Sequence, residues 1–267
     1  MDYSKFWSDD VGAFMRSPVR EIFRGYDLAK LYSFAGGYPD ASTFPLGEME
    51  KLAATVVAKY GAVALQYGST QGVTELRQAI AQRYGVDISN VQITTSSQQG
   101  IDVCTRVLVD PGDVVLTSNP CYLGALQSFR AYRADVRPLA FSAGGHSPRA
   151  KMIYVIPDFQ NPSGVTMTLE ERRALVDFAR REDLVIVEDS PYRELRYEGE
   201  DVPTIWSLAP ERTLHLGSFS KIFAPGLRLG WILGPQELLE QIYVCKQSLD
   251  LCPPVFDQYM AVEYLVS

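Results

Sequence analysis

Hydrophobic positions along the chain follow two periods that alternate from about residue 46 onward. Apolar residues spaced three and four apart predict helices over residues 48–60, 73–84, 97–109, 122–132 and 168–182, and from residues 236 and 255 onward. Short runs that are apolar on both faces predict strands at residues 91–95, 113–118, 134–140, 151–156, 184–189, 213–217 and 227–233. Such strands, separated by helices, predict an α/β fold with a mostly parallel central sheet and helices on both faces.

The first 45 residues follow neither period for long. We expect an irregular arm over about residues 1–35, with a short helix around residues 18–25. The stretch SFAGGYPDASTFPLG comes next, and its glycines and prolines predict turns. The chain therefore divides into an arm with a loop, residues 1–45, and one large domain, residues 46–267. The helix from residue 255 stops at Ser267 without a cap, so its apolar residues need a partner.

Composition and charge exclude several classes of protein. The chain has 267 residues, of which 46% are hydrophobic, and this ordinary apolar fraction excludes a disordered or low-complexity chain. The formal net charge of −7 disfavours a nucleic-acid-binding surface, and only two histidines argue against a histidine-rich metal site. We therefore expect neither a nucleic-acid partner nor a bound metal.

The cysteines and the N-terminus indicate the compartment. Cys104, Cys121, Cys245 and Cys252 form no C-x-x-C pair, which predicts unpaired thiols in a reducing cytosol. The N-terminal residues carry early acids and lack the apolar core of a secretory signal. No apolar run approaches the roughly 20 residues that span a bilayer. We expect a soluble, cytoplasmic protein with no membrane partner.

Polar residues follow directly after the predicted strands, at the sheet edge where open α/β sheets bind ligands. These positions carry hydroxyls, amides, one carboxylate and one amine, at Ser96–Ser97–Gln98, Asn119–Tyr122, Asn161, Asp189–Tyr192 and Ser218–Lys221. They contain no Ser-His-Asp set, no metal-ligand set and no G-x-G-x-x-G fingerprint. His215, inside a predicted strand, fits a packed residue better than a catalytic base.

Two of these groups suit an anion such as phosphate. Ser97 opens a predicted helix, where free N–H groups and the helix dipole attract negative charge, although simple N-capping is by itself the better explanation of a serine there. Ser218 and Ser220, together with Arg228, supply two hydroxyls and a guanidinium for phosphate oxygens. Taken alone, Arg228 fits a surface charge.

Lys221 and Asp189 are the two residues suited to covalent chemistry. Lys221 lies in the apolar stretch SFSKIFAPGLRLGW, where burial and nearby cations lower the pKa of an amine towards a nucleophilic range. A lone lysine is more often a solvated amine, and Asp189 in EDSPY could form an Asx-turn. Their joint appearance with two phosphate-binding groups suits pyridoxal phosphate, which needs a lysine and an acidic partner for its pyridine nitrogen.

The chain resembles the fold-type I pyridoxal-phosphate aminotransferases, in particular the subgroup with 2-aminoadipate, kynurenine and MocR-like proteins. The matching segments occur in family order and cover most of the chain: SFAGGYPD, LQYGSTQG, TTSSQQGID, NPCYLGAL, PDFQNPSG, VIVEDSPY and SFSKIFAPGLRLGW. Ser96 stands where a glycine is common, Ser163 replaces the usual threonine of NPTG, and Cys121 occupies a typical threonine position. None of these departures removes a group that the cofactor needs.

The resemblance implies a role for each motif residue. Lys221 would form the aldimine with pyridoxal 5'-phosphate and then shuttle the proton of the substrate α-carbon. Asp189 would keep the pyridine nitrogen protonated, while Asn161 and Tyr192 would bind the ring's 3-hydroxyl. The phosphate would be bound by five residues, and Tyr122 would stack on the ring. These five are Ser97, Gln98, Ser218, Ser220 and Arg228.

The resemblance also implies contacts with a partner subunit and with the substrate. Tyr67 would reach the phosphate of a second copy, so we expect a homodimer. Gly36 and Gly37 fall where the family backbone approaches the substrate, although a simple turn is the plainer interpretation. Arg20 could approach the substrate side chain and favour acidic substrates, or pair with Glu21 or a partner chain.

Function follows from the same resemblance. We expect an aminotransferase that moves an amino group between an amino acid and a 2-oxo acid. Two alternatives stay open: a lyase or decarboxylase of the same fold, which would use the same Lys221 and Asp189, and a non-catalytic cofactor-binding regulatory module. The family has a C-terminal small domain with an arginine for the substrate α-carboxylate, and Ser267 precedes it. We therefore expect a complete cofactor site without the arginine that orients the substrate carboxylate. Whether this chain turns over is left open by the sequence.

Overall fold

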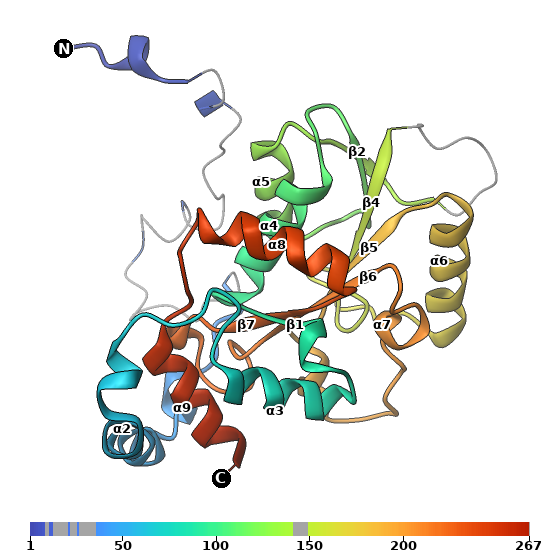
Figure 1. The fold of residues 1–267 in the computed structure, drawn as a ribbon. Helices are drawn as coiled ribbons and strands as arrows, with labels where there is room; N and C mark the ends of the chain where they lie inside the picture. Colours follow the sequence, from blue (N-terminus) through green and yellow to red (C-terminus); the bar gives the residue numbers. More distant parts are fainter. Residues whose placement is uncertain (9–10, 13–20, 22–25, 27–35, 141–148, 267) are drawn as a thin grey trace.

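The computed structural model of the chain describes residues 1–8, 11–12, 21, 26, 36–140 and 149–266. The short helix expected around residues 18–25, and Arg20 with it, lie outside the described residues. Within the described part, a seven-stranded sheet forms the centre, and helices cover both of its faces (Figure 1). The predicted α/β class is therefore confirmed.

The strands and helices match the predicted ranges closely. The strands are β1 (Val91–Thr94), β2 (Val114–Thr117), β3 (Asp135–Pro138), β4 (Ala150–Val155), β5 (Val185–Asp189), β6 (Thr213–Ser218) and β7 (Gly230–Leu233). The longer helices are α2 (Leu46–Tyr60), α3 (Thr74–Tyr84), α4 (Ser96–Leu108), α5 (Leu123–Ala131), α6 (Leu169–Arg181), α8 (Gln236–Gln247) and α9 (Val255–Val266). Thr168 and Glu171 form the capping box that starts α6.

The sheet is mostly parallel, as predicted, with one strand reversed. Its order is β1-β7-β6-β5-β4-β2-β3. Strands β3, β2, β4, β5 and β6 pair in parallel, whereas β7 runs antiparallel to both β6 and β1. Strand β7 was expected to start at residue 227, but it begins at Gly230. Pro225–Leu227 forms a 3₁₀ turn, and Arg228 has a left-handed φ of 52°, so the backbone cannot pair there.

Alternation along β5 assigns its side chains to opposite faces of the sheet. Ile186 packs with Leu175 and Phe178 of α6 on one face. Val187 packs on the other face, in a cluster with Ile101 of α4 and Phe129 of α5. Figure 1 shows α4, α5 and α8 on one side of the strands and α6 on the other. Asp189 is two residues after Val187, so its side chain lies on the same face, which α4 and α5 cover.

The final helix has the apolar partner that its sequence requires. Helix α9 lies beside α2 and α3 (Figure 1), and its buried residues join one core cluster with Val56 and Leu76. Tyr259 stacks on Tyr60 with ring centroids 3.9 Å apart. The helix that ends the chain is thus part of the folded unit.

Short turns are where the sequence predictions miss structure. The four-residue helix α7 (Ile205–Leu208) and several 3₁₀ turns had not been expected, because one turn of helix is too short to show a period. No helix formed by the described residues is long and apolar enough to cross a membrane.

Candidate active site

Asp189, the last residue of β5, is a buried carboxylate that is only half satisfied. Its Oδ2 accepts a hydrogen bond of 2.7 Å from the hydroxyl of Tyr154. Its Oδ1 is buried and has no hydrogen-bond partner within the described part of the chain. Burial raises the pKa of Asp189 to about 6, and the Tyr154 hydrogen bond offsets part of that rise. A buried acceptor without a donor indicates a place where a ligand supplies one.

Lys221 lies half-buried in the turn after β6. Its Nζ donates to the backbone carbonyl of Gly37 at 2.7 Å. Burial lowers the pKa of Lys221, and the charge of Arg228 lowers it further. The sequence had suggested both causes. Gly37 has a left-handed φ of 55°, which favours glycine at this position of the loop.

Asn161 and Tyr192 come from loops after neighbouring strands and meet. The Nδ2 of Asn161 donates to the Tyr192 hydroxyl at 3.2 Å. Burial raises the pKa of Tyr192, so its hydroxyl stays protonated near neutral pH. The pair thus presents an amide and a phenol side by side, next to the strand that ends in Asp189.

The anion-friendly residues form one group around the start of α4. Arg228 Nη2 donates to Ser96 Oγ at 2.7 Å, and Ser218 Oγ donates to Ser220 Oγ at 2.9 Å. The N-cap residue of α4 is Thr95 and no side chain caps the helix, so Ser97 is not a simple N-cap. The backbone of Gly230 lies so close that a Cβ there would be 2.8 Å from Ser97 N. A hydroxyl pair, a guanidinium and an uncapped helix start therefore lie together.

Gln98 and Tyr122 fix each other beside that group. The Tyr122 hydroxyl donates to Gln98 Oε1 at 3.2 Å, and Gln98 Nε2 donates to the carbonyl of Gly124 at 3.0 Å. A Cβ at Gly124 would lie 2.5 Å from Cζ of Tyr122, so only glycine allows the ring to lie there. The side chain of Gln98 is thereby engaged, while its backbone N–H belongs to the first turn of α4, where N–H groups have no acceptor within the helix.

Some expected residues are not drawn into this arrangement. The Tyr67 side chain is 79% exposed and makes no hydrogen bond to the site residues described above. Arg20 lies outside the described residues. His215 is fully buried and its Nδ1 lies 2.9 Å from Glu188 Oε2, which confirms the packed strand residue. The described residues hold no cluster of potential metal ligands.

Two features of the site were not found from the sequence. Tyr154 had been counted as part of an apolar strand, although a tyrosine hydroxyl inside a buried strand must find a partner. The second feature is Asp158, fully buried in the loop after β4. It accepts hydrogen bonds from three arginines: Arg172 at 2.8 Å, Arg196 at 2.7 Å and Arg193 at 3.5 Å.

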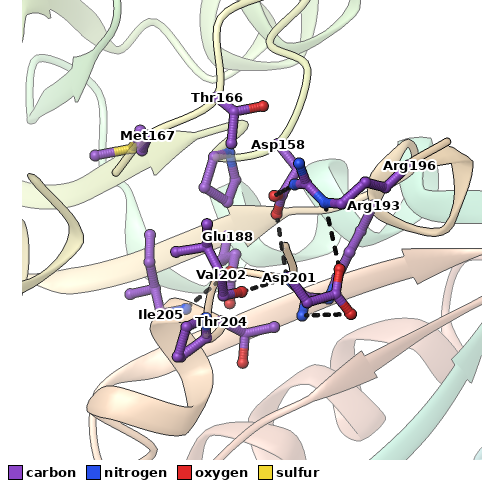
Figure 2. Close-up of polar contacts among 12 residues, drawn as sticks. Asp158, Thr166, Met167, Glu188, Arg193, Arg196, Asp201, Val202, Thr204 and Ile205 are labelled. Carbon is purple, nitrogen blue, oxygen red and sulfur yellow. Dashed lines mark hydrogen bonds and ion pairs between the residues drawn. The ribbon is translucent and has the colours of Figure 1, made fainter. Parts of the chain in front are cut away.

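The Asp158 cluster ties together the two loops that carry Asn161 and Tyr192. Asp158 precedes Asn161 by three residues, while Arg193 and Arg196 follow Tyr192. Figure 2 shows Asp158 and Asp201 pointing toward these two arginines. The Arg196 guanidinium also lies over the Phe159 ring, 4.8 Å from its centroid. The loops that carry Asn161 and Tyr192 are therefore joined by ion pairs to the buried Asp158.

The residues present fit pyridoxal phosphate. The unpartnered Asp189 Oδ1 can accept from a protonated pyridine nitrogen, Lys221 offers an amine of lowered proton affinity, and the α4 group can bind a phosphate. Fold and site together define a pyridoxal-phosphate-binding protein of the α/β class.

Comparisons with known proteins agree. Residues 36–263 match the family model of class I and II aminotransferases, and the chain belongs to this family. It is 38% identical to the aromatic-amino-acid aminotransferase 1 of Thermococcus litoralis, over 99% of this chain and 69% of that protein. It is 35% identical to the 2-aminoadipate transaminase of Thermus thermophilus, over 99% of this chain and 70% of the relative.

Solved structures of similar proteins carry the cofactor. The α-aminoadipate aminotransferase LysN of Thermus thermophilus, complexed with N-(5'-phosphopyridoxyl)-L-leucine, superposes with a TM-score of 0.90 at 34% identity. This match covers 100% of this chain and 71% of that one. A kynurenine aminotransferase of Pyrococcus horikoshii in complex with PMP gives a TM-score of 0.90 at 36% identity, covering 99% and 71%. The protein is a pyridoxal 5'-phosphate-dependent aminotransferase, an enzyme that acts on amino acids.

Proposed function

We propose that Lys221 and Asp189 carry the transamination chemistry of this chain. When bound, pyridoxal phosphate supplies an aldehyde that bonds amino groups and a ring that withdraws electrons from the reacting carbon. Lys221 Nζ holds the cofactor and moves a proton to and from the substrate α-carbon. Asp189 Oδ1 accepts the hydrogen bond of the pyridine nitrogen. The observation that carries this assignment is the buried Oδ1, which lacks a partner.

The remaining residues orient the cofactor. Asn161 and Tyr192, already bonded to each other, hold the ring's 3-hydroxyl. Tyr122, fixed over Gly124, stacks on the ring face. Ser97 and Gln98 bind the phosphate at the start of α4, because the uncapped N–H groups of a helix start attract an anion. The group after β6 binds it as well. That group consists of Ser218, Ser220 and Arg228.

The substrate side of the site is formed by the loop at Gly36 and Gly37. Its backbone lies within hydrogen-bond distance of the Lys221 amine, because the Gly37 carbonyl accepts from Nζ. We propose amino donors with long side chains, aromatic or of the 2-aminoadipate type, since the relatives named above are aminotransferases of these substrates. Arg20 stays a proposed contact for an acidic side chain.

A homodimer is part of the proposal. Tyr67 is largely exposed and would reach the phosphate bound by the partner subunit. Large apolar side chains of α2 and of the turn that follows it are exposed as well, which supports a protein interface there. They are Leu46, Val57, Val63 and Leu65.

The domain division and the compartment complete the proposal. We propose that residues 46–267 form the cofactor-binding domain, with residues 1–45 as an arm and substrate-side loop. A role in amino acid metabolism in the cytoplasm fits the four cysteines, which are free thiols as in a reducing compartment.

Covalent trapping tests the lysine. Borohydride reduction of the protein loaded with pyridoxal phosphate should fix the cofactor onto Lys221, as read by peptide mass spectrometry. Lys221→Ala should lose both the fixed cofactor and the visible absorbance, because it removes the amine that we assign to the cofactor. The exposed Lys51, paired with Glu48 at 3.2 Å, gives the control variant Lys51→Ala, which should behave as the parent. Fixation at another lysine would overturn the assignment.

Single-turnover conversion tests the donor. Bound cofactor should be converted to its amine form by 2-aminoadipate or an aromatic amino acid faster than by alanine. The change in cofactor absorbance during a single turnover measures the rate of this conversion. Equal rates for all three amino acids would contradict the proposed substrate class, and conversion of none would contradict turnover by this chain.

A further inference from the structure

Tyr154 occupies a defined place beside Asp189 in the sheet. On β4 it pairs with Val187 of β5, and Asp189 follows Val187 by two residues. Residues two apart in a strand share a face, so Tyr154 and Asp189 are diagonal neighbours on the side covered by α4 and α5. This geometry lets the phenol reach the carboxylate along the sheet.

The Tyr154 ring has no freedom to turn away. The side chain is 1% exposed, and its ring packs edge-on against Phe129 with centroids 5.5 Å apart. Among the described residues, its hydroxyl has one hydrogen-bond partner, Asp189 Oδ2. Asp189 likewise has no other hydrogen-bond donor there. The two groups therefore depend on each other.

We propose that Tyr154 is the positioning residue of Asp189: its hydroxyl holds Oδ2, so that Oδ1 is the oxygen presented to the pyridine nitrogen. This inference rests on the proposed role of Asp189. A carboxylate fixed at one oxygen cannot rotate about its terminal bond without breaking a charge-assisted hydrogen bond. The free oxygen thus keeps one direction before the cofactor arrives.

The same hydrogen bond keeps the negative charge on Asp189. Burial and the carboxylate beside it raise the pKa of Tyr154 well above its usual value, so the phenol remains a donor. Burial raises the pKa of Asp189 to about 6, whereas Tyr154 and the more distant His215 lower it. Among the described residues, the other titratable groups that interact with Asp189 are Cys104 on α4, Cys121 before α5, and Tyr192. None of these three donates a hydrogen bond to the Asp189 carboxylate, whereas Tyr154 does.

Loss of the hydroxyl should move a proton. In Tyr154→Phe the carboxylate keeps its burial but loses its donor, so its proton affinity rises. In the loaded protein, the proton shared with the pyridine nitrogen should shift towards Asp189. A purely structural tyrosine would change stability without moving that proton.

The experiment compares Tyr154→Phe with Tyr132→Phe. Tyr132 also donates to a carboxylate, Asp102 at 3.1 Å, but away from Asp189, so it controls for the loss of such a bond. In Tyr154→Phe, the carboxyl ¹³C titration midpoint of Asp189 in the cofactor-free protein should rise. The ¹⁵N shift of the bound cofactor's ring nitrogen should move towards the unprotonated value. The affinity of Tyr154→Phe for the cofactor, measured by fluorescence, should fall about tenfold, which is the effect of losing a hydrogen bond to a charged group. Tyr132→Phe should leave all three unchanged.

Two outcomes separate this inference from the assignment of Asp189 itself. An unchanged Asp189 titration and ring ¹⁵N shift in Tyr154→Phe would overturn the positioning role. Unchanged cofactor affinity in Asp189→Ala would instead overturn the proposed function. If Tyr154→Phe does not fold, the hydroxyl proton of Tyr154 in the unaltered protein provides the test: its ¹H resonance must shift as Asp189 titrates. A resonance that ignores this titration would contradict the inference.

Discussion

Asp158 follows β4 and Asp189 ends β5, the neighbouring parallel strand, and both are buried, with exposures of 0% and 2%. Asp158 accepts hydrogen bonds from three guanidinium groups. Asp189 accepts one, from a neutral phenol, and keeps an oxygen without a partner. Two aspartates at one edge of one sheet therefore have opposite surroundings.

The difference separates a structural charge from a functional one. A buried charge is tolerated where enough partners compensate for the lost water, and Asp158 meets that condition within the protein. Asp189 does not, and its raised pKa records the cost in the cofactor-free chain. In this protein, a buried carboxylate with a missing donor indicates the binding site better than the number of charges around it does.

Removing the carboxylate of Asp158 should have the largest effect on stability. Asp158→Asn keeps the shape but leaves the buried Arg172 without an anion and leaves Arg193 and Arg196 with only the exposed Asp201. Unfolding in urea should therefore show a loss of about 3–5 kcal/mol. The loops that carry Asn161 and Tyr192 should loosen as well. A loss below about 1 kcal/mol would show that the arginines find other acceptors, and the contrast with Asp189 would fail.

Removing the charge of Asp189 should instead stabilise the cofactor-free protein. Its folded pKa of about 6 exceeds the usual 3.8, so the folded state binds a proton that the unfolded state releases between these values. The ionised carboxylate therefore destabilises the fold above pH 6. Asp189→Asn should stabilise the cofactor-free chain there by about 3 kcal/mol, with no gain below pH 4.

Urea unfolding from pH 4 to pH 8 measures this effect in parent and variant. The same substitution should cost transamination roughly a hundredfold or more, because a preorganised charge at the reacting ring is lost. A variant as stable as the parent at every pH would show that Asp189 is not under strain.

The smallest effect is expected at Asp201, which shares Arg193 and Arg196 with Asp158. Its side chain is 70% exposed, and its carboxylate oxygens lie 3.7 Å from Arg193 Nη2 and 3.3 Å from Arg196 Nε. Asp201→Asn should cost less than about 1 kcal/mol, and less still at high salt, because water screens an exposed pair. A loss as large as that of Asp158→Asn would mean that burial does not decide the strength of these pairs.

What the sequence could predict was local. The strand and helix periods from residue 46 onward and the residues at strand ends follow from short windows of sequence, and the structure has them, apart from the later start of β7. The contacts of Asp158 do not, because its arginines are 14 to 38 residues away in the chain. Arg172 on α6 has the look of an exposed helical charge, yet it is completely buried. Only the tertiary fold brings such partners together.

The substrate-side loop holds the Lys221 amine through a main-chain oxygen, the carbonyl of Gly37. Every amino acid carries that oxygen, so no substitution at position 37 can delete it. Mutation can displace it only by changing the path of the loop. Side chains around this contact can therefore change while the main-chain oxygen that accepts from the Lys221 amine is kept.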